Sequence, residues 1–170
     1  MTIVTIAVEC YELGPLQTNC FVVRSERGSQ QAVVVDPGGD VTQLRIELAR
    51  MGASCAAILV THGHWDHVLG VADLAEATGA RIYIGEAELE LLEREQEWIG
   101  QTKLRSFVPD LRLSGGETID EAGLEIEVIS SPGHRPGHLA FYTQGCLFWA
   151  TSSSVARSGV PTLGVAIGRR

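Results

Sequence analysis

Short apolar runs separated by turn residues predict β-strands along most of the chain. Ile3–Val8, Phe21–Val23 and Ala32–Val35 are rich in the β-branched residues that strands favour. Ala56–Val60 is a continuous apolar run with the length of a buried strand. Leu124–Val128 alternates apolar and acidic residues, which predicts a strand with one buried face.

Three more short strands follow from the same reasoning. Arg81–Ile84 is one of them. Leu139–Tyr142 and Cys146–Trp149 are the other two, and we expect them to pair through a turn at Gln144-Gly145.

Apolar residues at helical spacing predict three helices between these strands. The first begins at Asp40, with Gln43 placed for a capping box, and ends at Gly52. The second covers about Trp65–Ala77, and the third covers Glu86–Trp98, whose run of glutamates we interpret as a solvated face. The apolar stripe of the first helix comprises Val41, Leu44, Leu48 and Ala49. The alternation predicts an α and β protein with functional residues in loops at strand ends.

Composition fits one globular domain over residues 1–170. Hydrophobic residues make up 45% of the chain, enough for a sizeable core. The net charge of −8 argues against a nucleic-acid partner. No apolar run reaches membrane length, and the N-terminal residues lack the basic region of a signal peptide, so we expect a cytoplasmic protein. The scattered cysteines, Cys10, Cys20, Cys55 and Cys146, are interpreted as buried thiols.

A cluster of metal-ligand residues directly follows the predicted strand Ala56–Val60. The segment reads Thr61-His62-Gly63-His64-Trp65-Asp66-His67. Imidazole and carboxylate groups suit Zn²⁺, Fe or Mn. In extended backbone His62 and His64 point the same way, whereas Asp66 and His67 in the first turn of a helix can face a second position nearby. The spacing therefore predicts a metal site.

The same segment resembles the His-x-His-x-Asp-His signature of the metallo-β-lactamase superfamily. Other parts agree in order. Val34-Val35-Asp36-Pro37-Gly38-Gly39 resembles the family's early turn, and Ser131-Pro132-Gly133-His134-Arg135-Pro136-Gly137-His138 resembles its second histidine segment. Thr18-Asn19-Cys20 resembles the opening of short glyoxalase II-like members. The resemblance covers about residues 10–148 and implies the αβ/βα four-layer sandwich of this family, an α+β fold.

The resemblance also implies a ligand set. His62, His64 and His134 would bind a first metal, and Asp66 and His67 would begin the site of a second. The metals would be one or two Zn²⁺ ions, with Fe or Mn as alternatives. Asp66 would also act in catalysis by holding a metal-activated hydroxide in line for attack.

Each of four further residues near these segments allows two interpretations. We favour the interpretation that His138 lies beside the ligands or serves in packing, and the alternative is that it binds the metal itself. Asp36 either orients a ligating imidazole or belongs to a plain Asp-Pro-Gly turn. Trp65 and Trp98 line the pocket or, as we favour, are ordinary core aromatics.

Residues 149–170 depart from the family pattern. After Leu147-Phe148 the family has Gly-Asp, whose Asp bridges two metals, and later a last metal-binding His. This chain has Trp149-Ala150-Thr151, and no histidine follows His138. Two explanations remain: a degenerate terminus, or, as we favour, a shifted reading frame. Codons for Trp-Ala read from their third base always begin with GGC, a glycine codon, and the shifted frame can continue as Gly-Asp-Leu-Val-Phe. On either explanation the second half of the fold is incomplete, with an exposed sheet edge.

The predicted activity is metal-dependent hydrolysis of a small-molecule thioester, as in glyoxalase II. The short chain and the Thr18-Asn19-Cys20 opening support it. Because the bridging Asp and the last His are missing, we expect low affinity for a second metal and little or no catalysis by this chain. A non-catalytic metal-binding remnant, a lactonase and a persulfide dioxygenase are the alternatives. We expect no membrane or nucleic-acid partner, and the oligomeric state is open.

Overall fold

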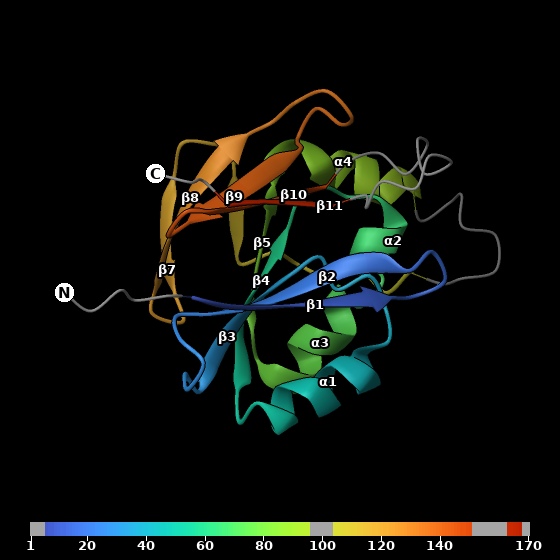
Figure 1. Cartoon of the computed structure of the whole chain (residues 1–170). Coiled ribbons are helices and arrows are strands. Elements are labelled where there is room, and N and C mark those ends of the chain that lie inside the picture. Colours follow the sequence, from blue (N-terminus) through green and yellow to red (C-terminus); the bar gives the residue numbers. More distant parts are fainter. Residues whose placement is uncertain (1–5, 96–103, 151–162, 168–170) are drawn as a thin grey trace, which may run out of the picture.

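A six-stranded sheet forms the first half of the protein in the computed structural model, which describes residues 6–95, 104–150 and, for the backbone alone, 163–167. Its strands lie in chain order (Figure 1). They are β1 (Ala7–Leu13), β2 (Thr18–Arg24), β3 (Gln31–Val35), β4 (Ser54–Val60), β5 (Arg81–Gly85) and β6 (Leu111–Leu113). The first three strands pair antiparallel, and β3 to β6 pair parallel. The carboxyl ends of β3, β4 and β5 therefore meet at one edge.

A five-stranded antiparallel sheet forms the second half, in the order β11-β10-β9-β8-β7. Its strands are β7 (Thr118–Glu121), β8 (Leu124–Ser130), β9 (Leu139–Thr143), β10 (Cys146–Ala150) and β11 (Leu163–Ile167). The predicted hairpin is confirmed, because β9 and β10 pair with Cys146 opposite Thr143. Its turn residues Gln144 and Gly145 have φ values of 44° and 86°, the positive values that a type I′ hairpin turn requires.

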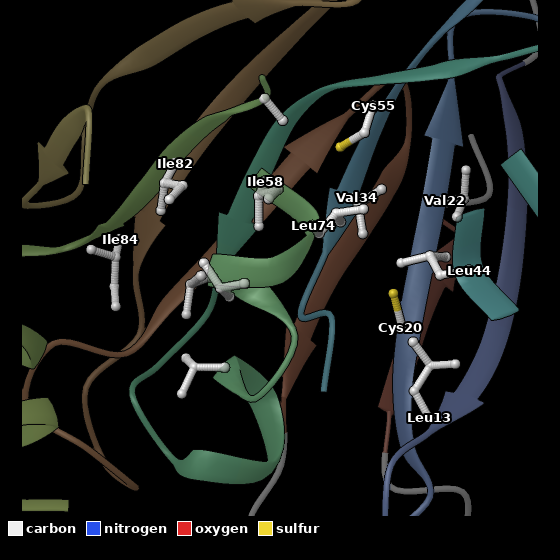
Figure 2. Packing of buried hydrophobic residues seen from close by; sticks show 14 of the residues in the cluster. Leu13, Cys20, Val22, Val34, Leu44, Cys55, Ile58, Leu74, Ile82 and Ile84 are labelled. Carbon is white, nitrogen blue, oxygen red and sulfur yellow. The ribbon is translucent and has the colours of Figure 1, made fainter. Parts of the chain in front are cut away.

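Helices α1 (Val41–Arg50) and α3 (Val71–Thr78) cover the outer face of the first sheet (Figure 1). Figure 2 shows Leu44 of α1 and Leu74 of α3 among Val22, Val34 and Ile58 of the sheet. Leu44, Val22, Val34, Ile58 and Leu74 are fully buried. The short α2 (Trp65–Val68) follows β4, and α4 (Glu86–Glu95) follows β5. No helix in the described part of the chain is long and apolar enough to cross a bilayer.

A second apolar core lies between the two sheets. Leu59 and Val35 of the first sheet contribute to it from one side, and Ile126, Phe141 and Phe148 of the second sheet from the other. The order of layers is helix, sheet, sheet. Over residues 6–95, 104–150 and 163–167 no helix covers the outer face of the second sheet, which agrees with the expected sandwich whose second half is incomplete.

Two predicted elements differ from the structure. The first strand runs Ala7–Leu13 rather than Ile3–Val8, whose first residues lie outside the described part. The predicted helix Trp65–Ala77 is two helices, because the chain breaks at Gly70. The backbone N–H of Gly70 donates to the Pro37 carbonyl at 2.8 Å, and a Cβ there would lie 2.8 Å from that oxygen. The break follows from this close approach of two backbones.

The predicted capping box at α1 is wrong. Asp40 has a left-handed backbone with φ of 46°, and its side chain makes no cap. Its carboxylate accepts instead from the backbone N–H of Gly14 at 2.9 Å, which ties the β1–β2 turn to the start of the helix. Gln43 donates to Glu47 on the helix surface.

Two interpretations of burial also change. Ala49, expected on the apolar stripe of α1, is exposed. Cys20 and Cys55 are buried thiols as expected, but Cys10 is exposed and Cys146 is half-buried. Cys10 is exposed because it lies on β1, at the edge of the first sheet.

Candidate metal centre

Two consecutive parallel strands and one loop of the second sheet bring the predicted residues to one place. Asp36 follows β3, and Thr61 to His64 follow β4. His134 and His138 lie in the loop between β8 and β9. The backbone N–H of Leu139 donates to the Thr61 carbonyl at 2.8 Å, which joins the two sheets beside this edge. The site therefore lies where the sequence predicts it, at the carboxyl ends of strands.

Ring nitrogens of His62, His64 and His134 converge on one point. Nδ1 of His64 lies 3.0 Å from Nε2 of His62 and 2.8 Å from Nε2 of His134. All three nitrogens lie within 4.8 Å of one another. Nitrogens around a tetrahedral Zn²⁺ are roughly 3.3 Å apart, given Zn–N bonds of about 2.0–2.1 Å. The three rings thus fit one metal ion after a small outward movement.

Asp36 fixes the protonation of His62 through Thr61. The Thr61 hydroxyl donates to Oδ2 of Asp36 at 2.6 Å, so it can only accept from Nδ1 of His62 at 3.0 Å. The proton of neutral His62 is therefore assigned to Nδ1, which leaves the lone pair on Nε2 directed at His64. This is the arrangement that a metal ligand needs, and it removes the alternative that Asp36 belongs only to a turn.

A second group of possible ligands adjoins the first. Asp36, His62 and His67 each offer an atom within 4.8 Å of the others. Oδ2 of Asp36 also accepts from Nδ1 of His67 at 2.9 Å, so Nε2 of His67 is left for another partner. That nitrogen lies 3.4 Å from Oδ2 of Asp66, and the Thr18 hydroxyl donates to the same oxygen at 2.9 Å. Asp66 and His67 thus lie together beside the three histidines.

The histidines differ in pKa because their surroundings differ. Burial, followed by the charge of the neighbouring imidazoles, lowers the pKa of His62 far below its usual value. Burial also acts to lower the pKa of His67, but the charge and hydrogen bond of Asp36 outweigh it and raise that pKa. His62 is thus neutral across the physiological range, whereas a proton on His67 competes with any metal.

His138 lies against the ligand group rather than inside it. Its ring centroid is 5.1 Å from that of His62, and its side chain is buried. Neither ring nitrogen makes a hydrogen bond of good geometry among the described residues. Burial lowers its pKa and outweighs the opposing effect of the nearby Ala150 backbone. This agrees with the favoured interpretation of a place beside the ligands. Trp65 is half-buried, and Trp98 lies outside the described residues.

Sequence reasoning missed Glu88. The run of glutamates predicts a solvated face of α4, yet Glu88 is 0% exposed. Its carboxylate accepts from the backbone N–H groups of Gly63 at 2.7 Å and of Gly137 at 2.9 Å. A signal was present in the sequence, because Glu88 precedes the buried Leu92 by four residues and so shares its helix face.

Comparison with known proteins agrees with this geometry. The model of the metallo-beta-lactamase superfamily matches residues 13–146. Hydroxyacylglutathione hydrolase GloC of Haemophilus influenzae is 27% identical over 139 residues, which are 79% of this chain and 65% of that protein. A hydroxyacylglutathione hydrolase of Pseudomonas entomophila is 35% identical over 125 residues, 74% of this chain and 42% of that protein. The chain therefore spans at most about two thirds of the length of these two relatives.

Solved structures give the same result. The BLEG-1 B3 metallo-beta-lactamase superposes with a TM-score of 0.73 and 28% identity over 81% of this chain and 68% of its own. TTHA1623, solved in a di-iron-bound form, has a TM-score of 0.72 and 31% identity over 94% of this chain and 80% of its own. With the histidine cluster at the edge shared by two sheets, these matches show that the chain belongs to the metallo-beta-lactamase superfamily.

Proposed function

We propose that this chain acts as a metal-dependent hydrolase of the glyoxalase II type, whose substrate is a thioester such as S-lactoylglutathione. The convergence of the His62, His64 and His134 nitrogens carries the proposal. Relatives named hydroxyacylglutathione hydrolase support the substrate class. Hydrolysis adds hydroxide to the thioester carbonyl carbon and breaks the C–S bond, and the sulfur leaves as a thiol after taking up a proton.

The five predicted ligands have separate roles in this proposal. His62, His64 and His134 hold one metal ion, and Asp66 and His67 contribute to a second position. A bound Zn²⁺ lowers the pKa of water from 15.7 to about 7 and so supplies hydroxide at neutral pH. Imidazole donors also bind iron, and the di-iron form of TTHA1623 makes iron a metal to test alongside zinc.

Asp66 is the residue we assign to catalysis. It is buried, and the Thr18 hydroxyl holds one carboxylate oxygen at 2.9 Å. The other oxygen is then available to accept a hydrogen bond from an attacking hydroxide and align it with the carbonyl carbon. Thr18 fixes the carboxylate orientation for that task.

A second candidate function is metal binding without turnover. In β10, Trp149 and Ala150 stand where the family pattern has Gly-Asp. This strand therefore brings no carboxylate to bridge two metals, and Thr151 lies outside the described residues. Under this alternative the three histidines hold one ion and thioester hydrolysis is absent.

The two functions are separated by one experiment on the purified chain. Metal-free protein is titrated with Zn²⁺ or Fe²⁺, bound metal is counted, and hydrolysis of S-lactoylglutathione is followed before and after EDTA. Hydrolysis that EDTA abolishes and that His134→Ala lacks supports the hydrolase. One bound metal without turnover supports the second candidate, and a wild-type chain that binds no metal contradicts both.

A further inference from the structure

Glu88 is a fully buried acidic residue whose hydrogen-bond partners lie in two loops outside its own helix. It begins the buried face of α4, and its side chain is 0% exposed. Oε2 accepts from the backbone N–H of Gly63 and from Nε of Arg135 at 3.1 Å, and Oε1 accepts from the backbone N–H of Gly137. A buried carboxylate is costly unless hydrogen bonds or an opposite charge compensate for it. Here both kinds of partner are present.

These partners belong to the two loops that carry the three histidines. Gly63 lies between His62 and His64 in the first loop. Arg135 and Gly137 follow His134 in the second loop. One carboxylate thus contacts both loops, although the first follows a strand of one sheet and the second joins two strands of the other.

Two glycines make room for this carboxylate. A Cβ at Gly137 would lie 2.8 Å from Cγ of Glu88, and a Cβ at Gly63 would lie 3.1 Å from its Oε2. Neither glycine has a positive φ, so glycine is required at these positions by contact rather than by backbone conformation. The sequence around His134 did not indicate that Gly137 makes room for a buried carboxylate.

We propose that Glu88 is a positioning residue that holds the loop of His62 and His64 against the loop of His134 and so sets the metal geometry. The inference rests on the proposed function, because the histidines are taken as ligands. Glu88 acts on them through the backbone of Gly63 and Gly137, by charge-assisted hydrogen bonds that are roughly twice as strong as neutral ones.

The test compares Glu88→Gln with Glu90→Gln. The amide of the first variant keeps the size of the side chain but turns one acceptor into a donor that faces an N–H group. Glu90 lies on the same helix at the surface, with 77% of its side chain exposed, and forms an ion pair with Arg94. Co²⁺ affinity and the visible spectrum of bound Co²⁺ are measured on protein shown to be folded by circular dichroism.

We expect Glu88→Gln to weaken Co²⁺ binding by about 10–100-fold, as changes in residues that orient metal ligands do, and to change the Co²⁺ spectrum. Glu90→Gln should match wild type within about twofold, as expected for a surface substitution. If Glu88→Gln folds and binds Co²⁺ as tightly as Glu90→Gln does, the proposal is wrong. In Gly137→Ala the new methyl group would clash with Glu88, and this variant should also weaken Co²⁺ binding.

A metal-free measurement keeps this inference separate from the proposed function. The ring centroids of His64 and His134 are 4.5 Å apart, close enough for a nuclear Overhauser effect between the rings. That effect, and slow amide exchange at Gly63 and Gly137, should be present in wild type and lost in Glu88→Gln. If wild type binds no metal but Glu88→Gln loses these contacts, the hydrolase proposal is contradicted and the role of Glu88 is supported. Unchanged contacts in Glu88→Gln overturn that role. If Glu88→Gln fails to fold, Glu88→Asp and Gly137→Ala are judged by the same two measurements.

Discussion

At the scale of single residues, Asp36 organises the site although it was not among the predicted ligands. One carboxylate accepts from the Thr61 N–H, the Thr61 hydroxyl and the His67 ring. It thereby sets the tautomer of two histidines, one through Thr61 and one directly. A metal-binding imidazole commonly donates its other N–H to such a partner, which fixes its orientation.

Asp36→Asn should weaken both the fold and metal binding. The neutral amide has a single acceptor oxygen, so it cannot replace all three hydrogen bonds that the charged carboxylate accepts. The loss of a charge-assisted bond lowers the free energy of unfolding by about 1.5–3 kcal/mol. Urea denaturation of the metal-free protein measures this, and metal titration should show an affinity about 10–100-fold lower. Asp120→Asn, at an exposed position on β7, should stay within about 0.5 kcal/mol. Equal stability of the two variants would contradict the assigned role.

The buried histidines predict a loss of stability in mild acid for the metal-free protein. The pKa values of His62 and His138 are lowered, so below about pH 6.5 the unfolded chain takes up protons that the folded protein does not, and each group costs up to about 1.4 kcal/mol per pH unit. His67 has a raised pKa. Its contribution to stability grows as the pH falls through its folded pKa and is complete below about pH 6.5, so it offsets part of the loss near neutral pH but none of the further loss below about pH 6.5.

Urea midpoints at about pH 7 and pH 5.5, on either side of the usual histidine pKa, test this dependence. The midpoint should fall at the lower pH, and it should fall less in His138→Gln, which has one fewer group to titrate. A midpoint that does not change between the two pH values would show that these rings are protonated without cost in the folded protein.

The predictability of the site from sequence also differs residue by residue. Four of the five predicted ligands lie in one segment, Thr61 to His67, whose spacing no packing requirement explains. The fifth, His134, was predicted from the resemblance of its segment to the family pattern. Glu88 lies within a run of similar residues, Glu86, Glu90 and Glu93 among them, and in the sequence only its spacing from Leu92 places it on the buried face of the helix. That burial arises from contacts with loops far away in sequence, which a helical pattern does not contain.

At the scale of elements, close contact between backbones shapes the site more than helix propensity does. The Pro37-Gly38-Gly39 turn packs on α2, and a Cβ at Gly38 would lie 2.0 Å from the Asp66 carbonyl oxygen. The same turn separates α2 from α3 at Gly70. Strands with a clear apolar run or alternation were predicted because that signal is local, whereas β6, β7 and β11 were not predicted. The break at Gly70 was missed because it depends on a turn that is distant in sequence.

Gly38→Ala should displace the first turn of α2, which carries Asp66 and His67. Because the obstructing atom is backbone, the clash cannot be relieved by a side-chain rotation, and we expect a loss of about 1–3 kcal/mol, typical of overpacking, with weaker binding of a second metal. Thermal unfolding and metal titration measure the two effects. Gly28→Ala is the control, since no atom lies within 4 Å of a Cβ there. Similar behaviour of both variants would show that the turn moves freely.

At the scale of the whole molecule, a bound metal should stabilise the fold by mass action. At a metal concentration about 100 times Kd the gain is about 2.7 kcal/mol, which raises Tm by roughly 5–11 °C for a domain of this size. Scanning calorimetry with Zn²⁺ and then with EDTA measures the rise and its reversal. His134→Ala should show little of this rise. An equal rise in that variant would place the stabilising metal elsewhere.

The two-sheet architecture was predicted from the family resemblance rather than from the pattern of strands, which indicated only an α and β protein. Residues 163–167 form β11 beside β10, so a strand follows the point where the family pattern ends. The shifted reading frame stays a prediction, because residues 151–162 lie outside the described part. Sequencing the gene across the codons for Leu147 to Thr151 tests it.

The contact between His64 and His134 has a consequence for the order of events during synthesis. Four of the proposed ligands leave the ribosome together, but His134 follows about seventy residues later, and closing a loop of that length costs entropy. The rings are brought together only when β9 packs beside the end of β4, where the backbone N–H of Leu139 donates a hydrogen bond to the Thr61 carbonyl. With the proposed ligand set, a nascent chain would hold a metal only loosely, and tight binding would wait until both sheets have docked.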